Sequence, residues 1–229
     1  MKKKSQRIFA GILAILVSIA MVGSGLLVFF FSGDDPLTGT GASKQTANAT
    51  AEYQAQKVRI DAMVQQAKVD PENVPLQTAL GNEYYNAGVA AQTVAPAEIQ
   101  ENFSKAVEAY QIVLKTNKDP NVMVDMATSA FYSQNFDLAD KSFKEALVIK
   151  PDFSNALVNY GIFLSQAKQD WAGALIQWQK ALPLAQKSSD KEQIQAMITQ
   201  AQGELKTNPA AGGTSNPNPA LTNPAGTGK

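Results

Sequence analysis

The sequence repeats itself with a period of about 34 residues, and this repeat limits the possible folds more than any other feature. The first clear copy consists of small and large residues at fixed intervals: Met123, Met126, Ala127, Ala130, Phe136, Ala139, Phe143, Ala146 and Pro151. The next copy continues the pattern with Leu157, Tyr160, Gly161, Leu164, Trp171, Ala174, Trp178 and Ala181. Such a period is typical of solenoids, in which each repeat buries its apolar face against its neighbours.

This pattern resembles the tetratricopeptide-repeat (TPR) family, and the resemblance covers residues 71–187. In that family each unit is a pair of helices. A large residue, a Leu-Gly-like pair and a Tyr-like residue mark helix A, and two small residues around an aromatic one, followed by Pro, mark helix B. Units 120–153 and 154–187 follow this pattern, with one extra residue in the turn near 168–170 of the later unit.

An earlier unit, about 71–119, matches the pattern in two separated pieces. The residues that fit helix A and helix B are Leu80, Gly81 and Tyr84, and then Ala106, Tyr110 and Val113. The interval between the two pieces exceeds that of the later units by about 13 residues. We therefore expect an insertion in the turn of this unit, at 89–100.

The folded body is expected to be all-α, because its apolar residues follow a helical period and no convincing strand alternation occurs. The expected helices are 47–69, 74–87, 99–117, 121–134, 136–149, 154–167, 171–186 and 190–206. Pro71, Pro120 and Pro151 mark boundaries between them. The predicted fold is a right-handed α-solenoid of about three TPR hairpins at 71–187, with an N-terminal helix in 47–70 and a capping helix in 188–206.

The repeat also predicts specific packing partners. Small residues on helix A should let helix B approach, while an aromatic residue on helix B fills the space towards the next unit. The small residues are Gly81, Ala127 and Gly161, and the aromatic ones are Tyr110, Phe143 and Trp178. The capping helix should cover the last repeat with a face made of Ile194, Met197, Ile198 and Ala201.

The N-terminus is predicted to be a membrane anchor. Residues 8–31 contain no ionisable side chain and, as a helix at about 1.5 Å per residue, are long enough to span a bilayer. Residues 1–7 are basic and should stay in the cytoplasm, which places the body outside it. The alternative is a cleaved secretory signal, but the apolar run continues beyond the candidate cleavage site. Ala10, Ala14 and Ser18 share one helix face, on which two anchors could form a weak homodimer.

Two further segments are expected to lack a fold of their own. Residues 32–46 are rich in Gly, Ser and Thr and should form a flexible linker between anchor and body. Residues 207–229 consist mainly of Pro, Gly, Asn, Thr, Ser and Ala, and are expected to be a disordered tail.

Composition removes several classes of function. The chain has no Cys and no His, which excludes disulfides, thiolate nucleophiles and histidine acid/base catalysis. Four of its 20 basic residues fall in the first seven positions, so the body is mildly acidic and lacks the basic stripe of a nucleic-acid binder. Acidic pairs such as Asp137 and Asp140 are interpreted as capping or solvated residues. We therefore expect that the protein is not an enzyme and that it has neither a cofactor nor a metal site.

In TPR proteins the inner groove is lined mainly by helix A residues at the second, fifth, sixth, ninth, twelfth and thirteenth positions of each unit. The resemblance therefore implies this candidate groove: Thr78, Asn82, Tyr85, Asn86, Asn121, Val124, Thr128, Phe131, Tyr132, Asn155, Val158, Asn159, Ile162 and Gln166. The Lys/Asn/Arg clamp of TPR domains that hold a terminal carboxylate is missing, because Thr78, Asn155 and Asn159 stand where cations would be needed. A neutral groove of amides and aromatics remains, suited to the backbone of an extended peptide. The alternative is that these Asn residues are simply polar residues on helix faces.

The sequence thus predicts a non-catalytic, membrane-tethered scaffold that binds other proteins outside the cytoplasm, as an adaptor for assembly, secretion or folding in a bacterial-type envelope. One alternative is a self-associating structural protein of the envelope. Another is a subunit like the membrane-anchored TPR proteins of cytochrome c maturation, because 174–182 resembles helix B of those proteins. Such likeness in layout does not decide the function.

Overall fold

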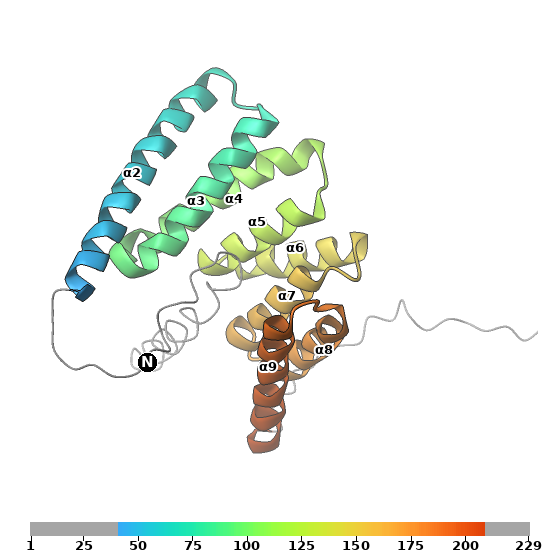
Figure 1. The fold of residues 1–229 in the computed structure, drawn as a ribbon. Helices are drawn as coiled ribbons and strands as arrows, with labels where there is room; N and C mark the ends of the chain where they lie inside the picture. Colours follow the sequence, from blue (N-terminus) through green and yellow to red (C-terminus); the bar gives the residue numbers. More distant parts are fainter. Residues whose placement is uncertain (1–40, 209–229) are drawn as a thin grey trace, which may run out of the picture.

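The structure, a computed structural model, describes residues 41–208, and their side chains from residue 47 onward. This part of the chain is helical and contains no strand, in agreement with the all-α prediction (Figure 1). The helices are α2 (Gly41–Val69), α3 (Val74–Val94), α4 (Ile99–Thr116), α5 (Pro120–Tyr132), α6 (Phe136–Ile149), α7 (Ser154–Ala167), α8 (Trp171–Ala181) and α9 (Ser188–Thr207). Two short 3-10 helices, η1 (Pro96–Glu98) and η2 (Leu182–Leu184), lie between them.

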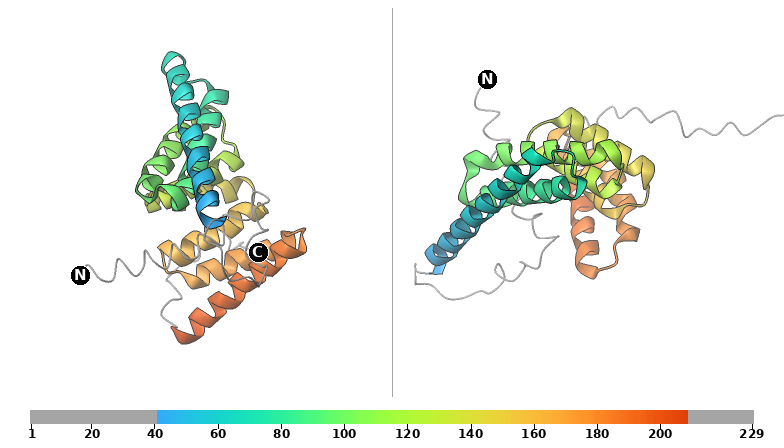
Figure 2. Two further views of the ribbon diagram at one scale, coloured as in Figure 1. Left: turned by 60° about the vertical axis from the view of Figure 1, so that its left-hand side comes forward. Right: turned by 90° about the horizontal axis from the view of Figure 1, so that it is seen from above.

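The helices pair into three hairpins that stack in chain order. Helices α3 and α4, α5 and α6, and α7 and α8 pack against each other, and α4 contacts α5 as α6 contacts α7. Helix α2 packs on α3 at one end of the stack, and α9 packs on α8 at the other (Figures 1 and 2). The arrangement is a stack of helical repeats. The first helices of successive hairpins are also in contact, since α5 contacts both α3 and α7.

Local sequence signals set the helix boundaries. Four hairpin helices begin with a side chain that caps a free backbone N–H: Asn73, Asp119, Asn135 and Asp170. The turns inside the second and third hairpins contain Gln134 and Gln169 in the left-handed conformation, with φ of 66° and 57°. The two turns therefore have a residue with the same left-handed backbone conformation, as expected of a repeat.

In the first and third hairpins the predicted small residue of helix A lies against the aromatic residue of helix B in the same unit, whereas the sequence pattern predicted that the ring fills the space towards the next unit. A Cβ added to Gly81 would lie 2.6 Å from Cε1 of Tyr110, and one added to Gly161 would lie 2.7 Å from Cδ1 of Trp178. Each ring thus occupies the space that the missing side chain leaves. The ring of Tyr110 is also fixed by its hydroxyl, which donates to Oδ1 of Asn82 at 2.8 Å.

The structure corrects the expected place of the added residues in the first unit. Residues 89–100 do not form a loop, because α3 continues to Val94 and α4 begins at Ile99. Helix α3 has 21 residues, against 13 in α5, so the addition lengthens the hairpin. A second close pair supports the longer hairpin: a Cβ on Gly88 would lie 2.8 Å from Cδ2 of Phe103, seven residues from the first pair on both helices. Two helical turns separate positions seven residues apart, so both pairs lie on one interface.

Two other boundaries differ from the sequence expectation. Helix α2 begins at Gly41, inside the predicted linker 32–46, because the residues that follow Gly41 include no further Gly or Pro to interrupt it. Helix α8 ends at Ala181 and not near 186, because Pro183 cannot donate to a continuing α-helix and the chain turns through η2.

Both end helices belong to the folded body. Tyr53 of α2 is 1 % exposed, and its hydroxyl donates to Glu98 at 2.8 Å while accepting from Asn102 at 2.9 Å. At the other end, the predicted face of α9 is confirmed, since Ile194, Ile198 and Ala201 are buried and Met197 is half-buried. Each end of the stack therefore has a covered apolar surface.

No helix within residues 41–208 combines the length and the apolar character that crossing a bilayer requires. The predicted anchor 8–31, its basic flank 1–7 and nearly all of the tail 207–229 lie outside the described residues. The small-residue face of Ala10, Ala14 and Ser18 lies outside them as well.

Candidate functional site

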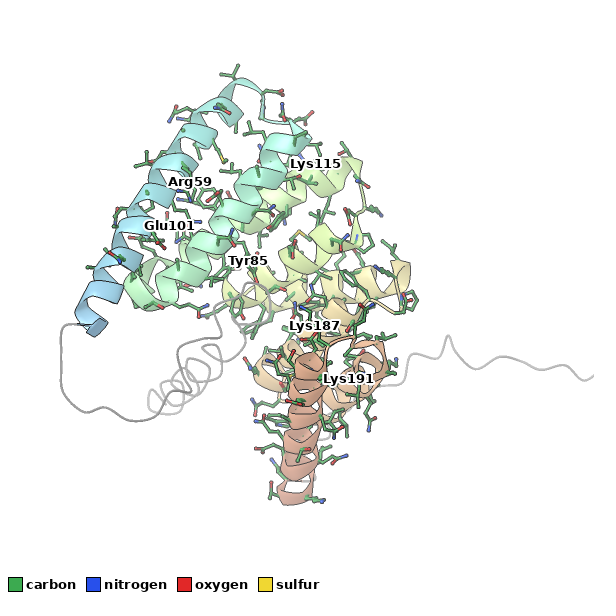
Figure 3. The ribbon with its side chains drawn as sticks, in the orientation of Figure 1. Arg59, Tyr85, Glu101, Lys115, Lys187 and Lys191 are labelled. Atoms are coloured by element: carbon green, nitrogen blue, oxygen red, sulfur yellow. The ribbon has the colours of Figure 1, made fainter. Side chains whose placement is uncertain are left out.

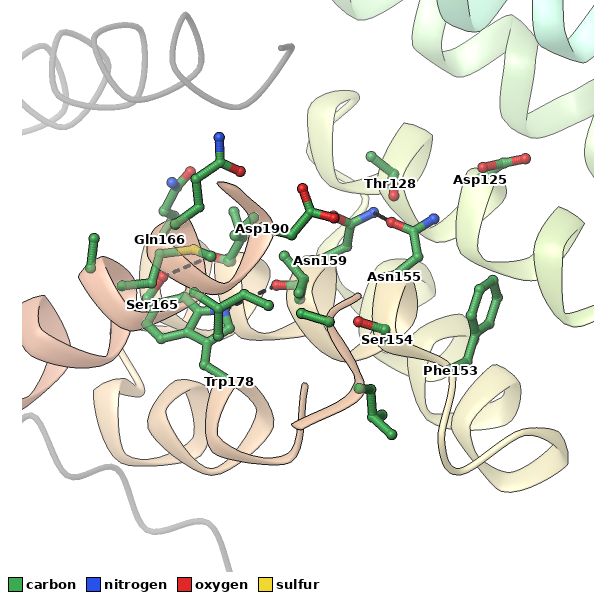
Figure 4. A pocket seen from close by; sticks show the side chains of 18 of the residues that line it. Asp125, Thr128, Phe153, Ser154, Asn155, Asn159, Ser165, Gln166, Trp178 and Asp190 are labelled. Atoms are coloured by element: carbon green, nitrogen blue, oxygen red, sulfur yellow. Dashed lines mark hydrogen bonds between the residues drawn. The ribbon is translucent and has the colours of Figure 1, made fainter. Parts of the chain in front are cut away.

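A groove of about 1240 Å³ runs along the inner side of the stack (Figure 4). It is lined by α3, α5, α7, α8 and α9 and by the chain segments that precede α7 and α9. Figure 3 locates two of its lining residues, Tyr85 on α3 and Lys187 just before α9. Helix α9, predicted only as a cap, thus also supplies one wall of the groove.

The structure brings most of the predicted groove residues together. Those that line the groove are Tyr85, Asn86, Thr128, Tyr132, Asn155, Val158, Asn159, Ile162 and Gln166. All lie on α3, α5 or α7, the first helices of the three hairpins, as the resemblance implied. Their role in binding stays a prediction.

Five predicted residues are outside this lining: Thr78, Asn82, Asn121, Val124 and Phe131. The Thr78 hydroxyl donates to the carbonyl of its own helix, and the amide of Asn121 pairs with Asp119. Oδ1 of Asn82 accepts from Tyr110. Val124 is fully buried, and Phe131 packs edge-on against Phe163 in the core. Each of these five side chains has a partner or a buried position within the fold.

The floor of the groove is the polar face of α7. Nδ2 of Asn159 donates to Oδ1 of Asn155 at 3.3 Å, which leaves one amide group of each residue unpaired among the described residues. The O and N positions of an amide are assigned from such networks. Further along α7, Oε1 of Gln166 is buried and has no hydrogen-bond partner in the described part of the chain. A buried acceptor without a partner costs free energy.

One side of the groove is aromatic. The ring of Phe103 lies 4.7 Å from that of Tyr132 and 5.5 Å from that of Tyr85, measured between centroids. Burial raises the pKa of Tyr85 to about 12 and that of Tyr132 further, so both phenols stay neutral and offer largely apolar surface. Trp178 also borders the groove, but its ring covers Gly161 and its Nε1 donates to the Val158 carbonyl at 3.1 Å. The interpretation of Trp178 as a packing residue is confirmed.

The structure adds charged residues that the sequence reasoning left out. The groove lining includes Asp125, Asp152 and Asp190 as well as Lys150 and Lys187. It is therefore not the neutral groove of amides and aromatics that the pattern predicted. Asp125 had a sequence signal, because it is the sixth residue of unit 120–153, the position that Asn159 occupies in the next unit.

Asp125 differs from the other groove carboxylates in its environment. It is half-buried, and no hydrogen bond or ion pair joins its carboxylate to another described residue. Burial, assisted by the nearby charge of Asp119, raises the pKa of Asp125 from 3.8 to about 6. In the view of Figure 4, Asn155 and Asn159 lie between the carboxylates of Asp125 and Asp190.

No protein-family model and no curated protein sequence matches the chain. Among solved structures, one described as "Crystal structure of MamA protein" is similar with a TM-score of 0.46 and 13% sequence identity, over 72% of this chain and 90% of that one. Another, "Crystal structure of MamA", gives a TM-score of 0.41 and 13% identity, over 75% of this chain and 98% of that one. Likeness at this level assigns no function, which is therefore argued from the groove itself.

Proposed function

We propose that this protein is a non-catalytic scaffold whose groove binds an extended segment of another protein. The observation that carries the proposal is the row of amides on α7, where Asn155, Asn159 and Gln166 line the groove and the first two each keep an unused hydrogen-bonding group. An Asn amide can pair with the N–H and the C=O of a peptide backbone together.

The length of this row fits an extended peptide. Asn155 and Gln166 are 11 residues apart in one helix, or roughly 16 Å at 1.5 Å per residue. About five residues of extended chain cover the same distance at 3.3 Å each. A bound segment would then have its backbone on α7 and some of its side chains against Tyr85 and Tyr132.

The TPR resemblance and the N-terminal sequence give the setting of the proposed scaffold. Residues 8–31 anchor the chain in a membrane, and the groove operates outside the cytoplasm as an adaptor for assembly, secretion or folding of envelope proteins. With α2 beginning at Gly41, only residues 32–40 separate the anchor from the folded body. Fully extended they span roughly 30 Å, which keeps the groove close to the membrane.

Site-specific photo-crosslinking in intact cells tests this proposal. A photoreactive residue replaces Asn159 in the groove, and the matched control replaces Gln111, an exposed residue on the α4 surface. We expect position 159 to capture a distinct protein that position 111 does not capture. Equal products from both positions would contradict a groove that binds partners. Capture of another copy of this chain alone would instead favour the self-associating structural protein.

Once a partner is known, the amide row can be tested by substitution. Asn155→Ala together with Asn159→Ala removes two side chains that each contribute about one net hydrogen bond. Affinity should fall by a factor of roughly 5 to 150, corresponding to about 1 to 3 kcal/mol. Calorimetry measures the affinity, and circular dichroism checks that the double variant remains folded. Unchanged binding by a folded double variant would show that recognition lies elsewhere.

A further inference from the structure

We infer that the groove selects segments that carry a basic side chain, preferably arginine, and that the carboxylate of Asp125 is the group that anchors it. This inference rests on the proposed function, because it specifies the chemistry of the partner that the groove binds. The sequence pattern predicted only that the groove recognises the backbone of an extended peptide.

Three aspartates and two lysines, Lys150 and Lys187, line the groove, and neither lysine forms an ion pair with Asp125. Asp125 lies on α5 between α3 and α7, and its side chain lines the groove (Figure 4). The ion pairs of the described residues join α2 to η1 and α3 or lie within α4 and α6, so none involves a groove residue. Lys150, a groove cation, has its Nζ 4.6 Å from the centre of the Phe153 ring. Asp125 is therefore an uncompensated carboxylate in a concave surface.

The groups around Asp125 make this carboxylate receptive to a cation. The titratable groups that interact with it are Tyr85 on α3, Tyr110 on α4 and Asp119 at the start of α5. None of them is a cation, and Asp119 raises the pKa of Asp125 in addition to the effect of burial. A basic side chain in the groove relieves this unfavourable state, and the reduced contact with water strengthens the attraction.

The aromatic side of the groove favours arginine over lysine. Tyr85 lines the groove together with Asp125, and its ring belongs to the cluster with Phe103 and Tyr132. A guanidinium group is planar and weakly hydrated, stacks on aromatic faces, and can donate two hydrogen bonds to one carboxylate. An ammonium group offers the charge without this geometry.

The other two groove carboxylates are weaker candidates. Asp152 is exposed, so water screens its charge. Asp190 is half-buried, but it accepts a hydrogen bond from the Ser189 hydroxyl at 3.2 Å. Of the three groove carboxylates, only Asp125 combines partial burial with the lack of any partner in the described part of the chain.

The first experiment selects peptides from a random nine-residue library with the full-length chain in detergent. Wild-type protein should enrich peptides with arginine at one position, and Asp125→Asn should lose that preference. The matched control is Asp61→Asn, which removes the same charge from an exposed position on α2 away from the groove. The control should select the same peptides as the wild type.

The second experiment measures a double-mutant cycle with the best selected peptide and its Arg→Gln form. Losing either the carboxylate or the guanidinium should weaken binding about 10- to 100-fold, and losing both should add little. Wild-type affinity should also fall as the pH drops below about 6, because protonation neutralises Asp125. The Asp125→Asn variant should not show this fall.

The outcomes separate the inference from the proposed function. A groove-dependent selection without arginine, or a cycle with additive losses, overturns the role of Asp125 and leaves the scaffold proposal intact. A wild-type protein that enriches no peptide at all overturns both. Enrichment of arginine peptides by Asp125→Asn to the same extent as by wild type would show that the charge is read elsewhere.

Discussion

Replacing Asp125 with asparagine should stabilise the folded protein near neutral pH. In the folded state the pKa of this carboxyl is about 6, against 3.8 for an unperturbed group. Between these two pH values the folded state binds more protons than the unfolded one, so the free energy of unfolding falls as the pH rises through that window. Above about pH 6 the whole cost of the buried charge is present.

The size of the effect follows from the pKa shift. A shift of about two units corresponds to roughly 3 kcal/mol at 1.36 kcal/mol per unit, and partial exposure reduces this value. We expect Asp125→Asn to raise the free energy of unfolding by about 1 to 3 kcal/mol at pH 7.5. Asparagine has nearly the same shape and no charge, so the packing around position 125 changes little.

Urea denaturation followed by circular dichroism measures this difference at pH 7.5 and again near pH 3.8. The gain should shrink at the lower pH, where the folded wild type carries a neutral carboxyl. The exposed control Asp61→Asn should change the free energy of unfolding by less than about 0.5 kcal/mol at either pH. Equal stability of Asp125→Asn and wild type at pH 7.5, or a gain that persists undiminished at low pH, would refute the reasoning.

Three further predictions follow from the described contacts and the sequence. Gly161→Ala should lower the free energy of unfolding by about 1 to 3 kcal/mol, because the added Cβ meets the indole ring of Trp178. Gly203→Ala on α9 has open space around it and should raise the free energy of unfolding by up to about 1 kcal/mol. Thermal melts that rank the two variants alike would contradict the packing. Tyr53→Phe should lower the free energy of unfolding by about 1 to 3 kcal/mol, because the buried amide of Asn102 loses the hydroxyl to which it donates. Arg59→Ala, at an exposed ion pair, should lower it by less than about 1 kcal/mol, and urea melts compare the two variants. Carbonate washing should leave the full-length chain in the membrane fraction, and a soluble product that begins near residue 21 would disprove the anchor.

The composition of the groove shows the limit of repeat reasoning. The family positions include Asn155 and Asn159, and both residues line the groove, because positions four residues apart share one face of a helix. The same positions placed Asn82 there as well, but its Oδ1 is taken by the hydroxyl of Tyr110 on the next helix. Whether a side chain bonds to a residue on another helix depends on the distance between the two helices. The position of that side chain within its repeat does not give this distance.

The sequence by itself determined the helical character of the body, the register of the units, and which positions carry the small and the aromatic residues, such as Gly81 and Tyr110. These features depend on local periodicity and on contacts between neighbouring helices at a fixed spacing. Only the tertiary structure decided that 89–100 lengthens a hairpin, that α9 forms a wall of the groove and that Asp125 is half-buried without a partner. Each of these features depends on how separate helices pack in space. The burial of the Asp125 carboxylate, for example, depends on residues of α3, α5 and α7 together, and these helices are far apart in the sequence.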